Sequence, residues 1–276
     1  MNSRRLFQYY LLFLTLGQCF DKVKSIIVGG TEVEVGRYPF AVSIVDGRET
    51  QFCGGVLISS TWVLTAAHCG IDRAAYVQIG RHNIDNKEEE FENIPIIAEY
   101  EHPDWCPDTM EYDFMLIQLE YDSEFEPIRL PDSNTAVDST VDVTVVGWGP
   151  NYFGGPNSDI LMKAELDVVD NLWCEQLYKE VRDVTDDMMC ASREELDACE
   201  GDSGGPLFIE DDELGDTLVG IVSWGTFCAD PSYPSVYARV TKAKQWIKEI
   251  IENNGNLRIS QLFKYRTKRM FKGLRR

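Results

Sequence analysis

One serine, one histidine and one aspartate of this chain have surroundings suited to nucleophilic chemistry. Ser203 lies in the glycine-rich run Cys-Glu-Gly-Asp-Ser-Gly-Gly-Pro at 199–206, and His68 lies in Thr-Ala-Ala-His-Cys at 65–69. A serine hydroxyl is a weak nucleophile at neutral pH unless a neighbouring base accepts its proton. His68 is the candidate base. The small residues around Ser203 would let the backbone N–H groups of Gly201 and Ser203 stabilise an oxyanion.

The third member of such a site would be a buried carboxylate on an apolar strand. Asp113 opens the run Asp-Phe-Met-Leu-Ile-Gln-Leu at 113–119, which is too hydrophobic for a surface acid. A glycine-serine turn or a single histidine by itself more often has no chemical role. The prediction therefore depends on all three residues occurring in one chain, in the order His, Asp, Ser.

The elements that must position these residues are mostly strands. Short apolar or alternating runs separated by turn residues predict antiparallel β structure. The expected strands are Phe40–Val45, Phe52–Ile58, Tyr76–Ile79, Phe114–Leu119, Val141–Val146, Leu161–Val168, Leu207–Ile209, Leu218–Ser223 and Val236–Val240. Two helices are expected, 172–180 capped by Asn171 and 242–253 capped by Thr241. In the second helix, residues 246, 247, 250 and 251 form one apolar face.

Five motifs, taken in order and at their spacing, resemble the chymotrypsin/trypsin family of serine proteases over about residues 27–253. They are Ile27-Val28-Gly29-Gly30, Ala66-Ala67-His68-Cys69, Asp113 before an apolar strand, Gly201-Asp202-Ser203-Gly204-Gly205-Pro206 and Ser223-Trp224-Gly225. The resemblance implies an all-β fold of two six-stranded antiparallel barrels, with the active site between them and a C-terminal helix. It also implies a secreted serine endopeptidase that acts through an acyl-enzyme and needs no cofactor.

The resemblance also assigns a substrate pocket. Asp197, six residues before Ser203, would lie at its base and favour cleavage after Lys or Arg, because a buried carboxylate requires a cation. Ser235 stands where trypsin-like members usually have glycine, and Phe227 replaces another small residue. Two outcomes stay open: a preference for the slimmer Lys over Arg, or weaker binding of both. The remaining expected pocket residues are Ser223, Trp224 and Gly225.

Activation is a second point of departure from the family. In the family, cleavage frees the amine of Ile27, which then pairs with Asp202 and orders the oxyanion hole. The residue before Ile27 is Ile26, where the family usually has Lys or Arg. A dipeptide-removing exopeptidase acting after cleavage at Lys24, an activator that accepts Ile, and a permanently latent protein all stay open. A latent member would act as a binding or regulatory protein.

The eight cysteines fit an oxidising compartment. By resemblance, the expected disulfides are Cys53–Cys69, Cys174–Cys190 and Cys199–Cys228. Cys19 would leave with a signal peptide, so Cys106 has no assigned partner. Cys106 is then either a capped or buried thiol, or a residue that bridges to another molecule or to the propeptide.

Composition divides the chain into four parts. Residues 1–19 carry two arginines and a short apolar run and are expected to be a signal peptide, followed by a propeptide at 20–26. The protease domain is expected at 27–254. The tail at 255–276 contains eight Lys or Arg and no acid. Either it is a disordered solvated segment, or it docks on the acidic body or an anionic surface.

Charge and spacing also limit the partners. The chain has a net charge of −20, and the eight cations of its tail leave −28 on the rest. Such an acidic body argues against nucleic-acid binding and favours cationic substrates. We expect protein or peptide substrates, possible inhibition by protein protease inhibitors, no transmembrane segment and a monomer. Metal binding is not expected, because Arg81 stands where calcium-binding relatives have Glu, and it is expected to pair with one of Glu88–Glu90 instead.

Overall fold

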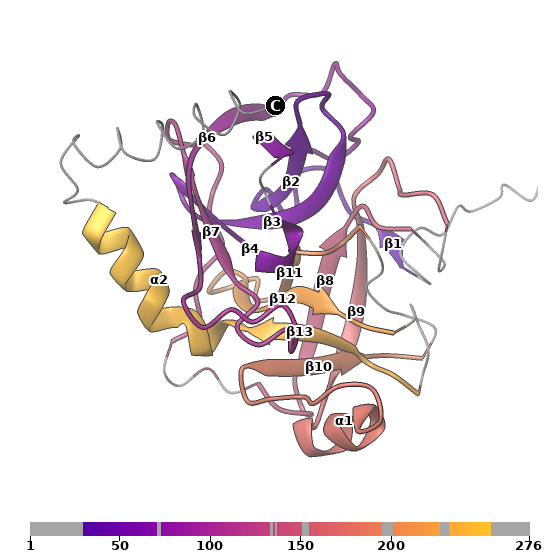
Figure 1. Cartoon of the computed structure of the whole chain (residues 1–276). Coiled ribbons are helices and arrows are strands. Elements are labelled where there is room, and N and C mark those ends of the chain that lie inside the picture. Colours follow the sequence, from indigo (N-terminus) through magenta and orange to yellow (C-terminus); the bar gives the residue numbers. More distant parts are fainter. Residues whose placement is uncertain are drawn as a thin grey trace, which may run out of the picture.

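A computed structural model describes residues 30–70, 73–132, 135, 137–150, 155–194, 201–226 and 232–254. Two antiparallel β-barrels lie side by side in it (Figure 1). The strands of the first barrel close in the order β2-β3-β4-β7-β6-β5. Their bounds are β2 Ala41–Asp46, β3 Gln51–Ser59, β4 Trp62–Thr65, β5 Ala74–Ile79, β6 Glu92–Glu101 and β7 Met115–Leu119.

The second barrel closes in the order β8-β9-β10-β13-β12-β11, because β8 pairs with both β9 and β11. A short strand, β1 (Thr31–Glu32), pairs with the first two residues of β9. The bounds are β8 Asp142–Gly147, β9 Met162–Val169, β10 Met188–Ser192, β11 Pro206–Ile209, β12 Thr217–Trp224 and β13 Ser235–Arg239. The expected fold of two six-stranded antiparallel barrels is confirmed.

Most strands of the barrels are continuously buried, whereas β9 alternates between buried and more exposed residues. In β9 every second residue is buried while the residues between are more exposed, which is the period of a half-buried strand. Aromatic rings join the barrels, since Phe208 of β11 lies 5.1 Å from the Tyr38 ring and 5.3 Å from the Phe40 ring. The core of the first barrel continues into the second through Leu218 and Ile221 of β12.

Three strands of the barrels were not among the predicted ones: β4, β6 and β10. β4 and β10 are only 4 and 5 residues long. β6 contains Pro95 and several acids, so its sequence lacks the apolar alternation of its neighbours. Pairing with the flanking strands brings these weak segments into the sheets.

Both predicted helices form, the first beginning one residue and the second two residues earlier than expected. α1 (Asn171–Tyr178) is capped by Asp170, whose carboxylate accepts from the N–H groups of Leu172 and Trp173 at 3.0 and 3.2 Å. Asn171 instead donates from its side-chain amide to the carbonyl of Met188 at 2.9 Å.

The C-terminal helix α2 (Val240–Asn254) begins one residue before the predicted cap, Thr241, and runs along one side of the molecule (Figure 1). Its predicted apolar face, at positions 246, 247, 250 and 251, packs against the hydrophobic core that the two barrels share. Among the described residues, no helix is long and apolar enough to cross a membrane.

Candidate active site

His68 and Asp113 are joined by two hydrogen bonds near the junction of the barrels. His68 lies in the short 3₁₀ helix η1 (Ala67–Cys69), and its Nδ1 is 2.7 Å from Asp113 Oδ2. The His68 backbone N–H also donates to Asp113 Oδ1 at 2.8 Å. Because a carboxylate only accepts, Nδ1 must carry a proton, so that in the neutral imidazole Nε2 is the acceptor. The pair therefore has the tautomer that a general base requires.

The two partners of this pair differ in how deeply they are buried. The Asp113 side chain is 0% exposed, whereas His68 is 24% exposed. Asp113 is tolerated inside the protein because the hydroxyl of Ser223 also donates to its Oδ2, at 2.5 Å. Three donors thus satisfy one buried carboxylate. Two of them belong to His68, and the third is the Ser223 hydroxyl of the second barrel.

Ser203 lies beside the segment that carries His68, since the Ser203 carbonyl oxygen is 3.7 Å from Cys69 Sγ. Its carbonyl accepts from the N–H of Gly54 in β3 at 2.7 Å. The next residue, Gly204, donates to the carbonyl of Val222 at 2.9 Å. Gly204 has a φ of +80°, and a Cβ there would overlap the hydroxyl of Thr65, so only glycine allows this approach. Backbone contacts from both barrels therefore fix the position of the half-buried Ser203.

The carboxylate of Asp202 points away from solvent into a space shaped by glycines. Asp202 is buried, and its Oδ1 accepts from the N–H of Gly149 at 2.7 Å. A Cβ at Gly147 or Gly149 would overlap this carboxylate, which explains both glycines of the sequence Gly-Trp-Gly. Gly201, with a φ of +100°, also requires glycine. Asp202 and the predicted oxyanion donors are thus held in one rigid turn.

The structure brings together four of the five predicted pocket residues. Ser223 and Trp224 end β12, Gly225 follows, and Ser235 begins the neighbouring strand β13. A Cβ placed on Gly225 would lie 3.6 Å from the Ser235 hydroxyl oxygen, so the two positions face each other. The hydroxyl of Ser223 is directed at Asp113, a contact that the sequence did not indicate. Asp197 lies outside the described residues.

Two of the three expected disulfides are present, Cys53–Cys69 and Cys174–Cys190. The first closes the segment that carries His68. Cys106 is a free thiol in the loop before Asp113. Hydrogen bonds from Thr109 and Asp108 lower the pKa of this thiol. The pair Cys199–Cys228, the substitution Phe227, the activation residue Ile27 and both chain termini lie outside the described residues.

The predicted ion pair of Arg81 with Glu88–Glu90 is wrong. Arg81 donates instead to the backbone carbonyls of Ile84 and Asn86, and its guanidinium lies 4.0 Å from the centre of the Phe91 ring. Glu89 accepts from the backbone N–H groups of His82 and Asn83 at 2.7 and 3.0 Å. Local backbone groups thus compete successfully with the expected pairing. Burial lowers the pKa of Arg81.

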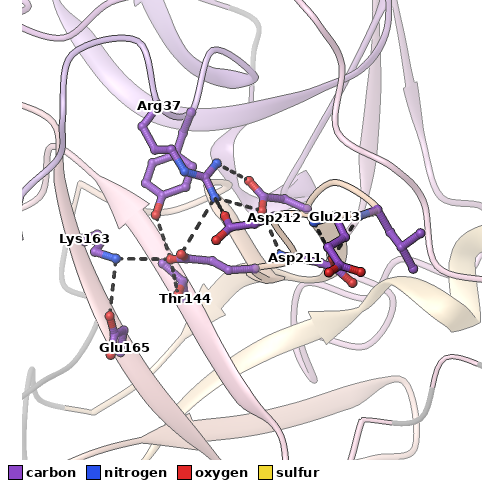
Figure 2. A network of polar contacts seen from close by, with 11 residues as sticks. Arg37, Thr144, Lys163, Glu165, Asp211, Asp212 and Glu213 are labelled. Atoms are coloured by element: carbon purple, nitrogen blue, oxygen red, sulfur yellow. Dashed lines mark hydrogen bonds and ion pairs between the residues drawn. The ribbon is translucent and has the colours of Figure 1, made fainter.

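A second group of charged residues joins the barrels elsewhere. Arg37, which precedes β2, donates to both carboxylate oxygens of Asp216 at 2.7 and 3.2 Å. The Tyr38 hydroxyl, the Thr144 hydroxyl and the Lys163 ammonium all bond Glu210 Oε1. Figure 2 shows this network around the loop between β11 and β12. No local sequence pattern indicates this network, because its members are far apart along the chain.

A double β-barrel with a bonded His–Asp pair at the junction is typical of one class of serine endopeptidases. The comparisons agree with this class. The sequence matches the Trypsin family over residues 27–247. It is 38% identical over 230 residues to Trypsin 5G1 of Aedes aegypti, an alignment that covers 81% of this chain and 84% of the relative. The chain belongs to the trypsin family and is a serine endopeptidase that acts on protein substrates.

Proposed function

We propose that the chain hydrolyses peptide bonds through a triad of His68, Asp113 and Ser203. The observation that carries the proposal is the bonding of His68 to the fully buried Asp113 at 2.8 and 2.7 Å. This arrangement leaves Nε2 of His68 to accept the Ser203 proton as the hydroxyl attacks the substrate carbonyl. Asp113 stabilises the imidazolium that forms, and the imidazolium then protonates the leaving amine. Water hydrolyses the resulting acyl-enzyme.

The oxyanion of each tetrahedral intermediate would be stabilised by the N–H groups of Gly201 and Ser203. Each such donor typically contributes about 10²–10³-fold to the rate. Asp202 would support these donors by pairing with the freed amine of Ile27. Its burial beside Gly147 and Gly149 supports this role, because a buried carboxylate favours a cationic partner.

For the substrate, we propose cleavage after Lys or Arg, with Asp197 as the counter-charge and Lys the better of the two. The Ser235 hydroxyl faces Gly225 and occupies space that a glycine would leave to the wider guanidinium. We further propose that the protein is secreted, with a signal peptide at 1–19, a propeptide at 20–26, the protease domain at 27–254 and a basic tail at 255–276.

Labelling with a fluorophosphonate tests the nucleophile. Activated protein should be labelled stoichiometrically at Ser203, and Ser203→Ala should abolish labelling and amide hydrolysis. Ser60→Ala is the matched control, because the Ser60 hydroxyl bonds an exposed carboxylate, Asp122, away from the His68–Asp113 pair. Substantial turnover by Ser203→Ala would contradict the triad. Absence of labelling in protein with a free Ile27 amine would favour a latent member of the family.

A peptide library tests the pocket. Asp197→Ser should reduce kcat/KM on Lys and Arg substrates by about 10²–10⁴-fold, because the substrate cation would be buried without a partner. Ser235→Gly should raise turnover of Arg substrates relative to Lys substrates. A preference of the unmodified enzyme for Phe, Leu or Ala would contradict the proposed specificity.

A further inference from the structure

The backbone directly before Asp113 has a conformation that non-glycine residues rarely adopt. Met110 has a φ of +64° and Tyr112 a φ of +50°. Both lie in the left-handed region, where the Cβ atom crowds the backbone. Such residues persist only when surrounding structure holds them in place. The contacts that hold Tyr112 also orient Asp113, because the conformation of Tyr112 sets the direction in which Asp113 leaves the loop.

A carboxylate of the second barrel bonds to this point of the first. Asp187, which directly precedes β10, is 4% exposed and accepts from the Tyr112 N–H at 2.6 Å. Its other oxygen accepts from the Thr185 hydroxyl at 2.6 Å. The Asp187 carbonyl accepts from the N–H of Arg239 in β13 at 2.7 Å. Asp187 is thus fixed to the frame of the second barrel, and it offers Tyr112 a charge-assisted hydrogen bond.

Other contacts show that the Tyr112 segment is tightly enclosed. The Tyr112 ring is stacked on the His102 ring at 4.7 Å, and His102 meets Trp246 of α2 edge-on at 4.9 Å. The Tyr112 carbonyl accepts from the N–H of Phe114 at 2.7 Å, so the backbone turns tightly around Asp113. A change of conformation at Tyr112 would therefore move Asp113 itself.

We propose that Asp187 is a positioning residue for the reaction. By holding Tyr112 in its left-handed conformation, it fixes Asp113 against His68 and in register with the barrel that carries Ser203. The inference rests on the proposed triad. It adds a second connection from the second barrel to Asp113, beside the direct bond from Ser223.

The chemical consequence follows from the contacts of Asp113 Oδ2. This oxygen lies 2.7 Å from His68 Nδ1 and 2.5 Å from the Ser223 hydroxyl. A displaced Asp113 would stabilise less the His68 imidazolium that forms as the reaction proceeds. Loss of Asp187 should then lower kcat more than it changes KM. It should also move the acid limb of the kcat/KM profile to lower pH, because the less stabilised imidazolium forms only at lower pH.

The experiment compares Asp187→Ala with Asp187→Asn and Asp216→Ala in activated enzyme. Rates are expressed per fluorophosphonate-titrated site, so that inactive protein does not contribute. Asp187→Ala should lose about tenfold or more in kcat with KM nearly unchanged, since small misplacements of catalytic groups cost up to about 10² in rate. Asp187→Asn should keep most of kcat, because its amide oxygen can still accept from the Tyr112 N–H.

Asp216→Ala is the matched control. Asp216 is also a buried aspartate of the second barrel that bonds a segment of the first, but through Arg37 and away from Asp113. It should lose stability while keeping kcat and the pH profile. Equal kcat and pH profiles for Asp187→Ala and unmodified enzyme would overturn the inference. So would an equal loss of kcat in Asp216→Ala.

If Asp187→Ala yields no titratable enzyme, the same change is combined with Tyr112→Asn, since asparagine adopts left-handed backbone more readily. Recovery of active sites in the double variant supports the inference, and failure in both backgrounds overturns it. Ser203→Ala is assayed alongside. Turnover by Ser203→Ala would remove the proposed triad, whereas an inert Ser203→Ala with a normal Asp187→Ala would remove only the role of Asp187.

Discussion

The second barrel holds the first in two regions that are built differently. Around Asp113 the contacts are few, short and buried, with Asp113 itself 0% exposed. Around Arg37 the contacts are many and partly exposed. The Arg37 side chain is 32% exposed and lies within 4 Å of three acids, of which Asp212 is 96% exposed. The first region can hold a single geometry, whereas in the second Arg37 can lose one acid and still be attracted by the other two.

The pKa shifts of the ionisable side chains also differ between the two regions. In the Arg37 network, burial opposes ionisation of Glu210, but hydrogen bonds from Tyr38, Thr144 and Lys163 outweigh it and lower the pKa of Glu210. Burial beside Glu210 raises the pKa of Tyr38. At the site, burial lowers the pKa of His102, which stacks on Tyr112. The network is therefore charged and polar, while the surroundings of Tyr112 favour an uncharged histidine.

The largest expected effect is at Asp113. In Asp113→Asn the amide would present a donor to the His68 ring, which favours the wrong tautomer. The expected loss in kcat is about 10⁴-fold, the size of the effect in the family archetype from which the mechanism is drawn. Steady-state kinetics on a Lys peptide amide measure it. Asp122→Asn, at an exposed aspartate, should retain normal kcat. More than about a tenth of normal kcat in Asp113→Asn would contradict the role of Asp113.

Ser223→Ala should have the next largest effect. It removes the 2.5 Å bond to Asp113 Oδ2 from the second barrel. A hydrogen bond to a charged group contributes about 1.5–3 kcal/mol, which corresponds to about 10–10²-fold in kcat if the loss falls on the transition state.

Ser43→Ala is the control for Ser223→Ala. The Ser43 hydroxyl is also buried but has no hydrogen-bond partner in the described part of the chain. The kcat per titrated site should be clearly lower in Ser223→Ala than in Ser43→Ala. Similar kcat values for the two would mean that Ser223 does not support the site.

In the Arg37 network, substitution should change stability and leave catalysis intact. Asp216→Ala removes two bonds from Arg37 to a buried carboxylate, and should lower the free energy of unfolding by about 1.5–3 kcal/mol. Asp212→Ala should cost at most about 1 kcal/mol, because Asp212 is exposed. Urea unfolding measures both. A large loss of kcat in Asp216→Ala would break the distinction between the two regions.

The smallest expected effect is the acid sensitivity of folding caused by His102. Its pKa is lowered in the folded protein, so below about pH 6.5 the unfolded chain binds more protons at this residue than the folded one does. Stability from this group is therefore complete above about pH 6.5 and is lost as the pH falls towards the lowered value. One proton contributes a slope of at most about 1.4 kcal/mol per pH unit. His102→Gln should flatten the stability curve in this window, and parallel curves would contradict the prediction.

Much of the fold and site could be predicted from local sequence. Alternation indicated β9, and continuous apolar runs indicated most of the other predicted strands. The flanking residues indicated His68, Asp113 and Ser203 as candidate site residues. β4, β6 and β10 were missed because they are short or contain proline and acids, and only pairing with neighbours makes them strands. The cap of α1 was placed one residue late because Asp170 and Asn171 are both good capping residues, and the contact with Met188 assigns Asn171 elsewhere.

The class of chemistry follows from local sequence, because it depends on residue types in short motifs. The contacts of Asp113 and of the backbone before it follow instead from the tertiary fold. Ser223 and Asp187 are separated from Asp113 or its neighbour Tyr112 by 110 and 75 positions, and no local pattern relates them. The same holds for Arg37 and Asp216, which are 179 positions apart. Contacts over such separations form only when the closing of two barrels brings distant segments together.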